Sequence, residues 1–221
     1  MIAVVDYGAG NLTSVRKALE AIGAAIWTPA EPAELERAAG IIVPGVGHFS
    51  STARLDDPWR GGIHGALGRS VPVLGICVGL QWLFDGSTEA PDVAGLGLLP
   101  GTCAHLGVGD SRGTRKVPHV GWNSLSFPRS TRLFAGIREG AQVYFTHSFA
   151  APVGTATAAT TTYGVTFAAA VEDGLVSGVQ FHPEKSGDVG LRILRNWLSA
   201  VSSCRSPTHA VETNNRVSRR A

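Results

Sequence analysis

The segment Val71-Pro-Val-Leu-Gly-Ile-Cys-Val-Gly-Leu-Gln81 joins a strand-like run to a helix-like run through a glycine-flanked cysteine. Its first half is a short apolar stretch of the kind that forms a fully buried strand. The run Val78–Asp85 follows without a linker and favours a helix. Gly75 and Gly79 flank Cys77 as in a nucleophile elbow, a turn so tight that a neighbouring side chain would clash. The segment therefore predicts a cysteine held where a buried strand becomes a helix.

At such a helix N-terminus the dipole favours the thiolate form of a cysteine. Cys77 is therefore a candidate nucleophile. The alternative for this motif by itself is a core cysteine on a glycine-rich turn, because free cysteines are commonly buried.

On the N-terminal side of this segment, strand-like and helix-like runs alternate. Apolar residues recur at helical spacing after Asn11, which is placed to cap a helix that Gly23 ends. The expected strands are Ile2–Tyr7, Ile26–Thr28 and Gly40–Pro44, and the expected helices are Leu12–Ile22, Glu31–Ala39 and Pro58–Arg69. This alternation indicates an α/β fold with a mostly parallel sheet covered by helices on both faces.

Beyond Gly95 the pattern changes to strands with few helices between them, which predicts added antiparallel strands. These are Leu96–Leu106, Arg115–Phe127, Gln142–Phe145, Thr155–Thr162, Val165–Glu172 and Leu175–Gln180, before a final helix over Val189–Leu198. No linker composition marks the change. We therefore expect residues 1–198 to form a single domain and residues 199–221 to form a disordered basic tail.

Composition excludes several classes of protein. Of 221 residues 44% are apolar and the net charge is only +2, which rules out a disordered chain. No apolar run approaches the roughly 20 residues of a membrane span. The tail holds the excess of arginine, so the body offers no basic patch for nucleic acid. Three scattered cysteines fit neither a disulfide framework nor a zinc site, and with no signal-peptide pattern they predict a cytoplasmic protein.

A thiolate nucleophile needs a base, and the run Val179-Gln-Phe-His-Pro-Glu-Lys185 offers one. Pro183 biases His182 towards extended backbone, in which residues two apart point the same way. Glu184 then bonds one imidazole nitrogen and leaves the other for the sulfur. Cys77, His182 and Glu184 are therefore predicted to form a catalytic triad. A surface His-Pro turn is the alternative for this motif by itself, and the other histidines lack metal-ligand spacing.

Acyl transfer also requires hydrogen-bond donors for an oxyanion. The amide of Val78 is one candidate, and the loop Pro44-Gly-Val-Gly47 offers a second if its peptide reorients. A plain glycine-rich loop is the alternative. The turn Tyr7-Gly-Ala-Gly-Asn11 has Thr13 where a phosphate-binding turn has its third glycine, which favours a simple strand-to-helix turn.

Six stretches resemble the class I, or triad, glutamine amidotransferases. They are Gly75–Gln81, Gln180–Ser186, Asp6–Asn11, Pro44–Phe49, Val117–Asn123 and Tyr144–Ser148. They match in order over residues 2–198, and the last four are most similar to the glutaminase subunits that serve a cyclase in histidine biosynthesis. The resemblance implies a flavodoxin-like fold.

The resemblance also implies a reaction. Cys77 attacks the side-chain amide of glutamine, His182 gives a proton to the departing ammonia, and water hydrolyses the glutamyl thioester. The ammonia passes to a (βα)8-barrel cyclase subunit, the heterodimer partner, and no cofactor or metal is implied. Activity in the family rises when the cyclase binds its nucleotide, which implies that Gly45–Gly47 reorients.

Further roles follow from the resemblance. Val46 and Val78 are expected to supply the oxyanion amides. The residues expected to contact glutamine are Gly45, Gly47, Gln81, Ser148 and Phe149, and those expected at the partner interface are Asn11, His119, Trp122, Tyr144 and Lys185. The chain departs from the usual pattern at Val78, Leu80 and Phe149, the last of which lacks the hydroxyl of the common tyrosine.

Three alternatives stay open. The chain could be a class I glutaminase that serves another synthase, with the same chemistry and a different partner. It could be a cysteine hydrolase or peptidase with the same elbow, which would need neither an acid after the histidine nor a partner. It could also be a non-enzymatic scaffold, which the intact triad disfavours.

Overall fold

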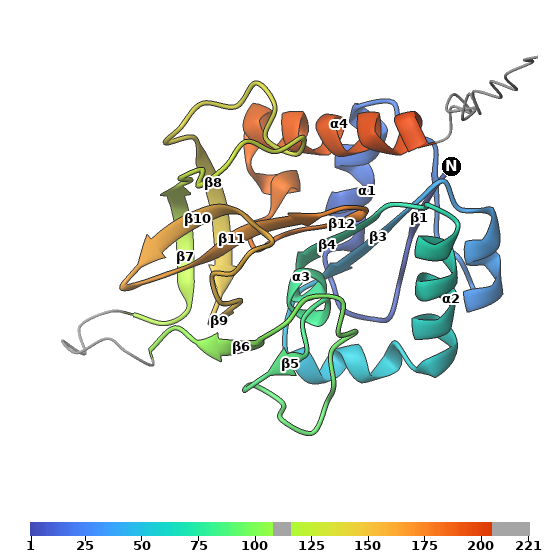
Figure 1. Ribbon diagram of the computed structural model, residues 1–221, viewed down its shortest axis with the longest axis horizontal. Coiled ribbons are helices and arrows are strands. Elements are labelled where there is room, and N and C mark those ends of the chain that lie inside the picture. Colours follow the sequence, from blue (N-terminus) through green and yellow to red (C-terminus); the bar gives the residue numbers. More distant parts are fainter. Residues whose placement is uncertain (108–115, 205–221) are drawn as a thin grey trace, which may run out of the picture.

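The computed structural model describes residues 1–107 and 116–204. Its centre is a seven-stranded sheet with the order β10-β11-β12-β4-β3-β1-β2 (Figure 1). The first elements are β1 (Ile2–Val4), α1 (Leu12–Ala21), β2 (Ile26–Trp27), η1 (Pro32–Arg37), β3 (Gly40–Gly45), η2 (Phe49–Arg54), α2 (Asp57–Gly68), β4 (Val73–Cys77) and α3 (Val78–Trp82). Then come β5 (Gly86–Ser87), β6 (Thr102–His105), β7 (His119–Ser124), β8 (Gln142–His147), β9 (Phe149–Ala150), β10 (Thr157–Tyr163), β11 (Val165–Asp173), β12 (Val176–Val179), η3 (Pro183–Lys185) and α4 (Gly187–Cys204).

The central sheet combines a parallel part with an antiparallel part. β2, β1, β3, β4 and β12 form parallel pairs, whereas β11 pairs antiparallel with both β12 and β10. This confirms the predicted change of topology along the chain. Because Gly45 lies opposite Cys77 in the β3–β4 register, the loops after both strands leave the same edge of the sheet, where α/β folds place their sites.

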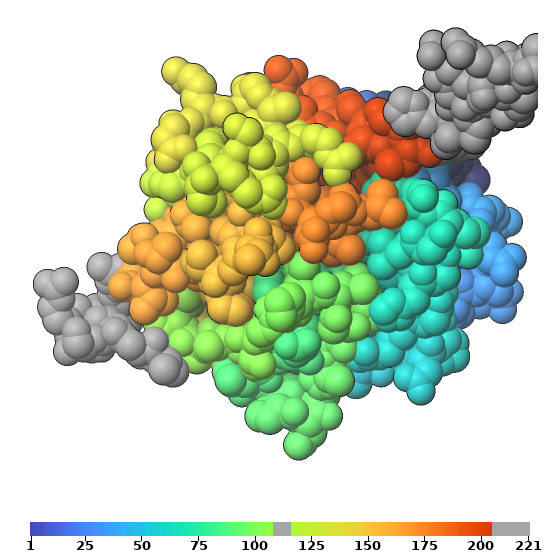
Figure 2. Space-filling view, viewed as in Figure 1, coloured from blue at the N-terminus to red at the C-terminus, as the bar shows by residue number. Residues whose placement is uncertain are grey.

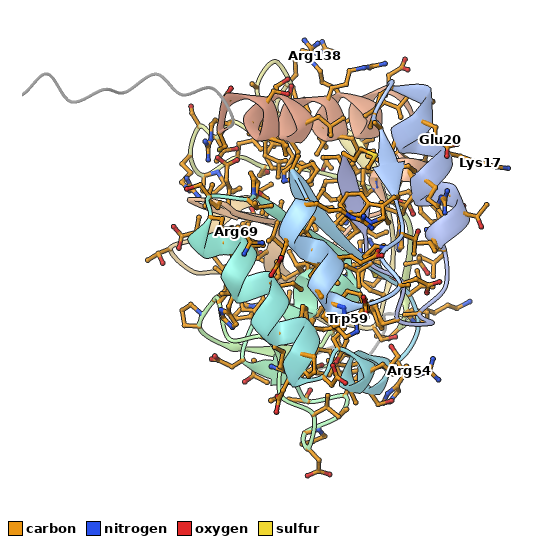
Figure 3. All side chains as sticks on the ribbon, turned by 90° about the vertical axis from the view of Figure 1, so that its right-hand side faces the viewer. Lys17, Glu20, Arg54, Trp59, Arg69 and Arg138 are labelled. Carbon is orange, nitrogen blue, oxygen red and sulfur yellow. The ribbon has the colours of Figure 1, made fainter. Side chains whose placement is uncertain are left out.

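Helices cover both faces of the sheet, as the alternating pattern predicts. In Figure 3, α1, which carries Lys17 and Glu20, lies at the upper right of the view, and α2, which Arg69 follows, lies at the left. Lys17 and Glu20 project outwards from α1, and its Val15 and Leu19 are buried against the strands. Strands β1, β3 and β4 are buried along their whole length, which explains why they are continuous apolar runs rather than alternating ones.

The last helix is longer than predicted. The sequence predicts its end at Leu198, whereas α4 runs to Cys204. The reason is that Val201 and Trp197 pack against Gly40 at the start of β3, and both are almost fully buried. Residues 199–204, assigned to the tail, therefore continue this helix, and residues 205–221 lie outside the described residues.

Several boundaries differ in smaller ways. The predicted helix Glu31–Ala39 is a short 3-10 helix, η1, and the helix after Cys77 ends at Trp82 rather than at Asp85. The short elements η2, β5 and β9 have no counterpart among the predicted ones. Part of the predicted strand Arg115–Phe127 forms β7, which pairs with β8 in a separate two-stranded sheet.

The two halves of the chain occupy different sides of the molecule. In the space-filling view the N-terminal part, blue to cyan, lies on the right, and the β7–β11 part, light green to orange, lies on the left (Figure 2). None of the described helices combines the length and the apolar character needed to cross a membrane.

Candidate active site

The elbow at Cys77 has the geometry that the sequence predicts. Cys77 ends β4 and precedes α3, with φ 55° and ψ −109°, a strained backbone for a residue with a side chain. A Cβ atom at Gly79 would collide with the carbonyl of Val43, and one at Gly75 would crowd the backbone of Gly79. Both glycines are therefore required by close backbone contacts.

His182 and Glu184 form the predicted pair by a different local route. His182 is extended, but Glu184 lies in the 3-10 turn η3 rather than two residues along a strand. The turn brings Nδ1 of His182 within 2.7 Å of Oε1 of Glu184, and both side chains are fully buried. The backbone amide of His182 donates to the carbonyl of Tyr144 at 2.9 Å, which fixes the segment against β8.

The remaining imidazole nitrogen of His182, Nε2, is buried without a short hydrogen bond. The Cys77 side chain lies close enough to interact with the ring. Loose contacts of this kind are common in free enzymes and tighten when substrate binds. The three predicted triad residues are therefore together at one place.

Two features of the surroundings of His182 have opposite effects on its pKa. Burial lowers the pKa because the charged ring loses water. Hydrogen bonds to Cys77 and Glu184, and the negative charges of both, outweigh burial and raise the pKa of His182 to about 9. The ring is thus a cation at neutral pH, ready to give a proton to a leaving group.

Two residues without a predicted catalytic role donate hydrogen bonds to members of the triad. Nε2 of Gln180 donates towards the sulfur of Cys77 at 3.7 Å, and Gln180 is fully buried. Its place two residues before His182, inside a quoted motif, was the only sequence signal for it. Asn11, predicted to cap α1, makes no cap hydrogen bond and donates its side-chain amide to Oε1 of Glu184, and its place at the partner interface stays a prediction.

A cavity of about 210 Å³ opens beside Cys77. Four of the five predicted glutamine contacts line it, together with Val78 and four residues that the sequence analysis had not selected. The predicted ones are Gly47, Gln81, Ser148 and Phe149, and the others are Glu89, Pro118, Thr146 and His147. Gly45 and Val46 do not line the cavity, and Gly45 instead packs under the side chain of Tyr7.

The polar groups of the cavity suit an amino acid. The Glu89 carboxylate accepts from the Phe49 amide at 2.7 Å, and a carboxylate at this wall can pair with an ammonium group. Nε2 of Gln81 donates to the Phe149 carbonyl at 2.7 Å and to Gln180 at 3.1 Å. Its donors are therefore used, and its carbonyl oxygen is the atom available to a ligand N–H.

A chain of buried side chains runs from the cavity wall towards β7. Nδ1 of His147 contacts the Phe149 carbonyl at 2.9 Å, and Nε2 of His147 contacts Nδ1 of His119 at 3.1 Å. A carbonyl only accepts, so Nδ1 of His147 carries its hydrogen and Nε2 accepts from His119. Nε2 of His119 is then the acceptor for the Asn123 amide at 3.4 Å. Burial lowers the pKa of His119 to about 4 and that of His147 to about 3, so both rings are neutral.

The residues predicted at a partner interface divide into two groups. Trp122, Tyr144 and Lys185 cluster on one surface, with Trp122 edge-on to Tyr144 and the Lys185 ammonium 5.8 Å from the Tyr144 ring centre. Trp122 is 56% exposed. His119 is only 2% exposed and is stacked between Phe145 and Tyr163, so it lies beneath this surface, and its place at the interface stays a prediction.

Within the ranges 1–107 and 116–204, no group of three or more potential ligand side chains could hold a metal ion.

Comparison with known proteins addresses the family. Residues 3–201 match the family model described as glutamine amidotransferase class-I. The subunit HisH of imidazole glycerol phosphate synthase from Moorella thermoacetica is 43% identical, covering 94% of this chain and 99% of that protein. The HisH subunit from Geobacillus kaustophilus is 44% identical, covering 91% and 98%.

Solved structures agree on the fold. A crystal structure of a glutamine amidotransferase superimposes with a TM-score of 0.70 at 19% identity, covering 91% of this chain and 100% of that one. PurLQS from Thermotoga maritima gives a TM-score of 0.69 at 20% identity, covering 90% and 97%. The fold is thus that of the class I amidotransferases, as expected. With the site geometry and the near-complete matches together, the chain belongs to the class I glutamine amidotransferases and, among them, to the HisH subunits of imidazole glycerol phosphate synthase.

Proposed function

We propose that this chain hydrolyses glutamine through a thioester on Cys77 and supplies the ammonia to a cyclase partner in histidine biosynthesis. The observation that carries the proposal is the convergence of Cys77, His182 and Glu184, with Cys77 on the wall of a small polar cavity. Family membership supplies the substrate, and the geometry supports the roles of the three residues.

In the first half-reaction the sulfur of Cys77 attacks the side-chain carbonyl carbon of glutamine. The carbonyl oxygen becomes an oxyanion, for which the amides of Val78 and Val46 are the proposed donors. As the carbon–nitrogen bond breaks, the His182 cation gives its Nε2 proton to the departing nitrogen, which leaves as ammonia. Glu184 keeps the ring oriented and stabilises its charge.

In the second half-reaction a water attacks the thioester. His182, now neutral, takes a proton from that water, the carbon–sulfur bond breaks, and glutamate leaves. The sulfur departs as the thiolate and His182 is again a cation, so the starting state is restored. Ammonia has no need to leave through bulk water if the partner covers the mouth of the cavity.

The size of the cavity weighs against a peptidase. Pockets for drug-sized ligands are about 300–1,000 Å³, whereas this one is about 210 Å³. Glu89 also places a negative charge on the wall, which suits the free ammonium group of an amino acid rather than an uncharged peptide bond. Glutamine fits both features.

A partner surface is proposed at β7, β8 and η3. Trp122 and Val120 are among the few large apolar side chains exposed in the described residues, at 56% and 57%. Exposed aromatic residues beside a cation are typical of interface cores and their rims. A (βα)8-barrel cyclase is the partner that the family implies, and a heterodimer in the cytoplasm is the proposed assembly.

The direct test is glutamate release by the isolated chain and by the chain mixed with the cyclase and its nucleotide. Turnover that rises sharply with the complete mixture supports the proposal. Turnover that is equally fast without any partner favours an independent hydrolase. Failure of the wild-type chain to release glutamate in the complete mixture would overturn the proposed function.

The interface has a matched pair of variants. Val120 and Val153 are equally exposed, at 57% and 53%, and only Val120 lies on the proposed surface. Val120→Asp should weaken binding of the cyclase by roughly tenfold or more, measured by calorimetry, because it buries an unpaired charge. Val153→Asp should leave binding unchanged. Equal effects would place the interface elsewhere.

A further inference from the structure

Tyr7 carries a buried hydroxyl group for which nothing in the proposed reaction accounts. The residue follows β1 and is 6% exposed, and its hydroxyl has no hydrogen-bond partner among the described residues. Buried polar side-chain atoms are nearly always hydrogen-bonded, so an exception calls for an explanation. The Tyr7 hydroxyl is therefore a buried donor without an acceptor in the described part of this conformation.

The hydroxyl lies against the strand that leads into the proposed oxyanion loop. A Cβ atom at Gly45 would collide with the hydroxyl oxygen of Tyr7 and would stand 3.1 Å from Cβ of Val78. The phenol thus reaches from the end of β1 across Gly45 towards the elbow. Its hydroxyl lies against Gly45, which precedes Val46 in the chain and itself lies close to Val78; Val46 and Val78 are the two proposed oxyanion donors.

The phenol keeps its proton and is held firmly at its backbone end. Burial raises the pKa of Tyr7, and the nearby charge of Cys77 raises it further, so the group is an O–H donor at any working pH. Arg54, labelled in Figure 3, donates to the Tyr7 carbonyl at 3.3 Å. The Gly8 amide next to it donates to Asp6 at 2.9 Å.

The neighbouring loop, in contrast, has room to reorient. Gly47 has φ 102°, and a Cβ atom placed there would touch nothing within 4 Å. Val46, the proposed donor, does not line the cavity in this conformation. The loop therefore has a hinge at Gly47 on one side and the Tyr7 hydroxyl at Gly45 on the other.

We propose that Tyr7 is a positioning residue for the oxyanion site. When the Gly45–Val46 peptide turns its amide towards the cavity, its carbonyl oxygen turns away from the cavity and accepts the hydrogen bond of the Tyr7 hydroxyl. That bond holds the Val46 amide in the donor orientation. This inference rests on the proposed glutaminase function, and it gives the unpaired hydroxyl a partner in the active conformation only.

Tyr7→Phe tests the inference because it removes one oxygen atom and little else. In the resting protein that oxygen has no partner, so thermal stability should be unchanged or slightly higher. With the cyclase and its nucleotide present, kcat for glutamine hydrolysis should fall at least tenfold, while KM stays within twofold of the wild-type value. A merely structural role predicts the reverse, with lower stability and unaffected kcat.

A second measurement separates oxyanion stabilisation from reactivity of the sulfur. Alkylation of Cys77 by iodoacetamide forms no oxyanion, so its rate should be the same in Tyr7→Phe and in the wild type. Slowed alkylation in parallel with slowed glutamine turnover would overturn the inference, because Tyr7 would then act on Cys77 itself.

Thr161→Val is the matched control. Its hydroxyl is also buried without a partner in the described structure, but it lies on β10, away from the elbow. It should leave both kcat and KM unchanged. A Tyr7→Phe chain whose kcat is within twofold of an active wild type overturns the role of Tyr7 alone, whereas a wild type without glutamine turnover overturns the proposed function as well.

Discussion

Two buried histidines near Cys77 differ in charge. His182 is fully buried and has a pKa raised to about 9, whereas His147 is 6% exposed and has a pKa lowered to about 3. Burial lowers the pKa of both rings. The difference comes from the neighbouring groups: the Cys77 sulfur and the Glu184 carboxylate raise the pKa of His182. His147 has only the Phe149 carbonyl as an acceptor at Nδ1, and His119 and His182 lower its pKa further.

The comparison teaches that the groups beside a buried histidine, together with its burial, decide what the ring can do. A carboxylate next to the ring stabilises the cation, and the ring can then carry a proton during the reaction. A carbonyl partner fixes a neutral tautomer, and the ring then serves as a rigid link between hydrogen-bonding groups. The site therefore has a proton-carrying side, formed by His182 and Glu184, and a proton-free side, formed by His147 on the cavity wall and its hydrogen-bonded neighbours.

The largest expected effect comes from the sulfur of Cys77. Cys77→Ala should lower glutamine hydrolysis by at least ~10⁴-fold, because no other group can form the thioester. Binding of the cyclase should persist, since Cys77 is 2% exposed and is not part of the proposed partner surface. Glutamate release and calorimetric binding, measured on one preparation, check both. Surviving hydrolysis would mean that the nucleophile is misassigned.

Glu184→Gln should come next, because it converts the acceptor of His182 to an uncharged one of the same shape. We expect kcat to fall roughly 10²–10³-fold, less than for Cys77→Ala, since the carboxylate orients and stabilises rather than attacks. The pKa of His182 should drop, because burial lowers it and the Glu184 carboxylate that raised it is no longer there. An NMR titration of the ring measures this. A loss of activity equal to that of Cys77→Ala would indicate a direct chemical role for Glu184.

The sequence predicts the proton-carrying side well. Gly75, Cys77 and Gly79 lie next to one another along the chain, as do His182 and Glu184, so local motifs carry most of the chemistry. The antiparallel extension also follows from the change of pattern beyond Gly95. These features are local in sequence, and local rules of turns and apolar runs are enough to predict them.

The proton-free side is not visible in the sequence because its contacts join distant segments. His147 contacts His119 across a β-sheet pairing. On the proton-carrying side too, Asn11 contacts Glu184 across more than a hundred residues, which the sequence does not reveal. Asn11 also appeared to be a helix cap, since its position satisfies that rule as well. Tertiary contacts decide between two roles that the local sequence permits equally.

A smaller effect is expected on the proton-free side. Two variants of His147 test its two hydrogen bonds separately. His147→Asn keeps a donor near the Phe149 carbonyl, whereas His147→Gln reaches towards His119 and loses that donor. His147→Gln should raise KM for glutamine about tenfold, because the Phe149 carbonyl also anchors Gln81, and His147→Asn should raise it less. Steady-state kinetics from pH 6 to 8 should give the wild-type pH profile for both variants, because the replaced ring is neutral. A shifted profile would show that His147 carries a proton after all.

The smallest effect concerns stability and tests the neutral state directly. His119 and His147 have pKa values of about 4 and 3 in the folded chain, below the ordinary 6.5 of an unfolded one. Below pH 6.5 these two histidines therefore become protonated in the unfolded chain, whereas they stay largely neutral in the folded chain. The free energy of unfolding should fall as the pH falls from 6.5 towards 4, by up to about 1.4 kcal/mol per pH unit for each ring.

His119→Phe should reduce this decline, since it keeps a ring stacked on Phe145 and Tyr163 and removes one titrating group. At pH 7 the variant should be less stable by about 1 kcal/mol, because Nε2 of His147 loses its donor. At pH 5 this difference in the free energy of unfolding should close or reverse. The wild type is destabilised by protonation of His119 in its unfolded chain, and the variant is not. Denaturant unfolding at both pH values measures this. Parallel curves for wild type and His119→Phe would mean that His119 is protonated in the folded chain, and the contrast with His182 would then rest on His147 alone.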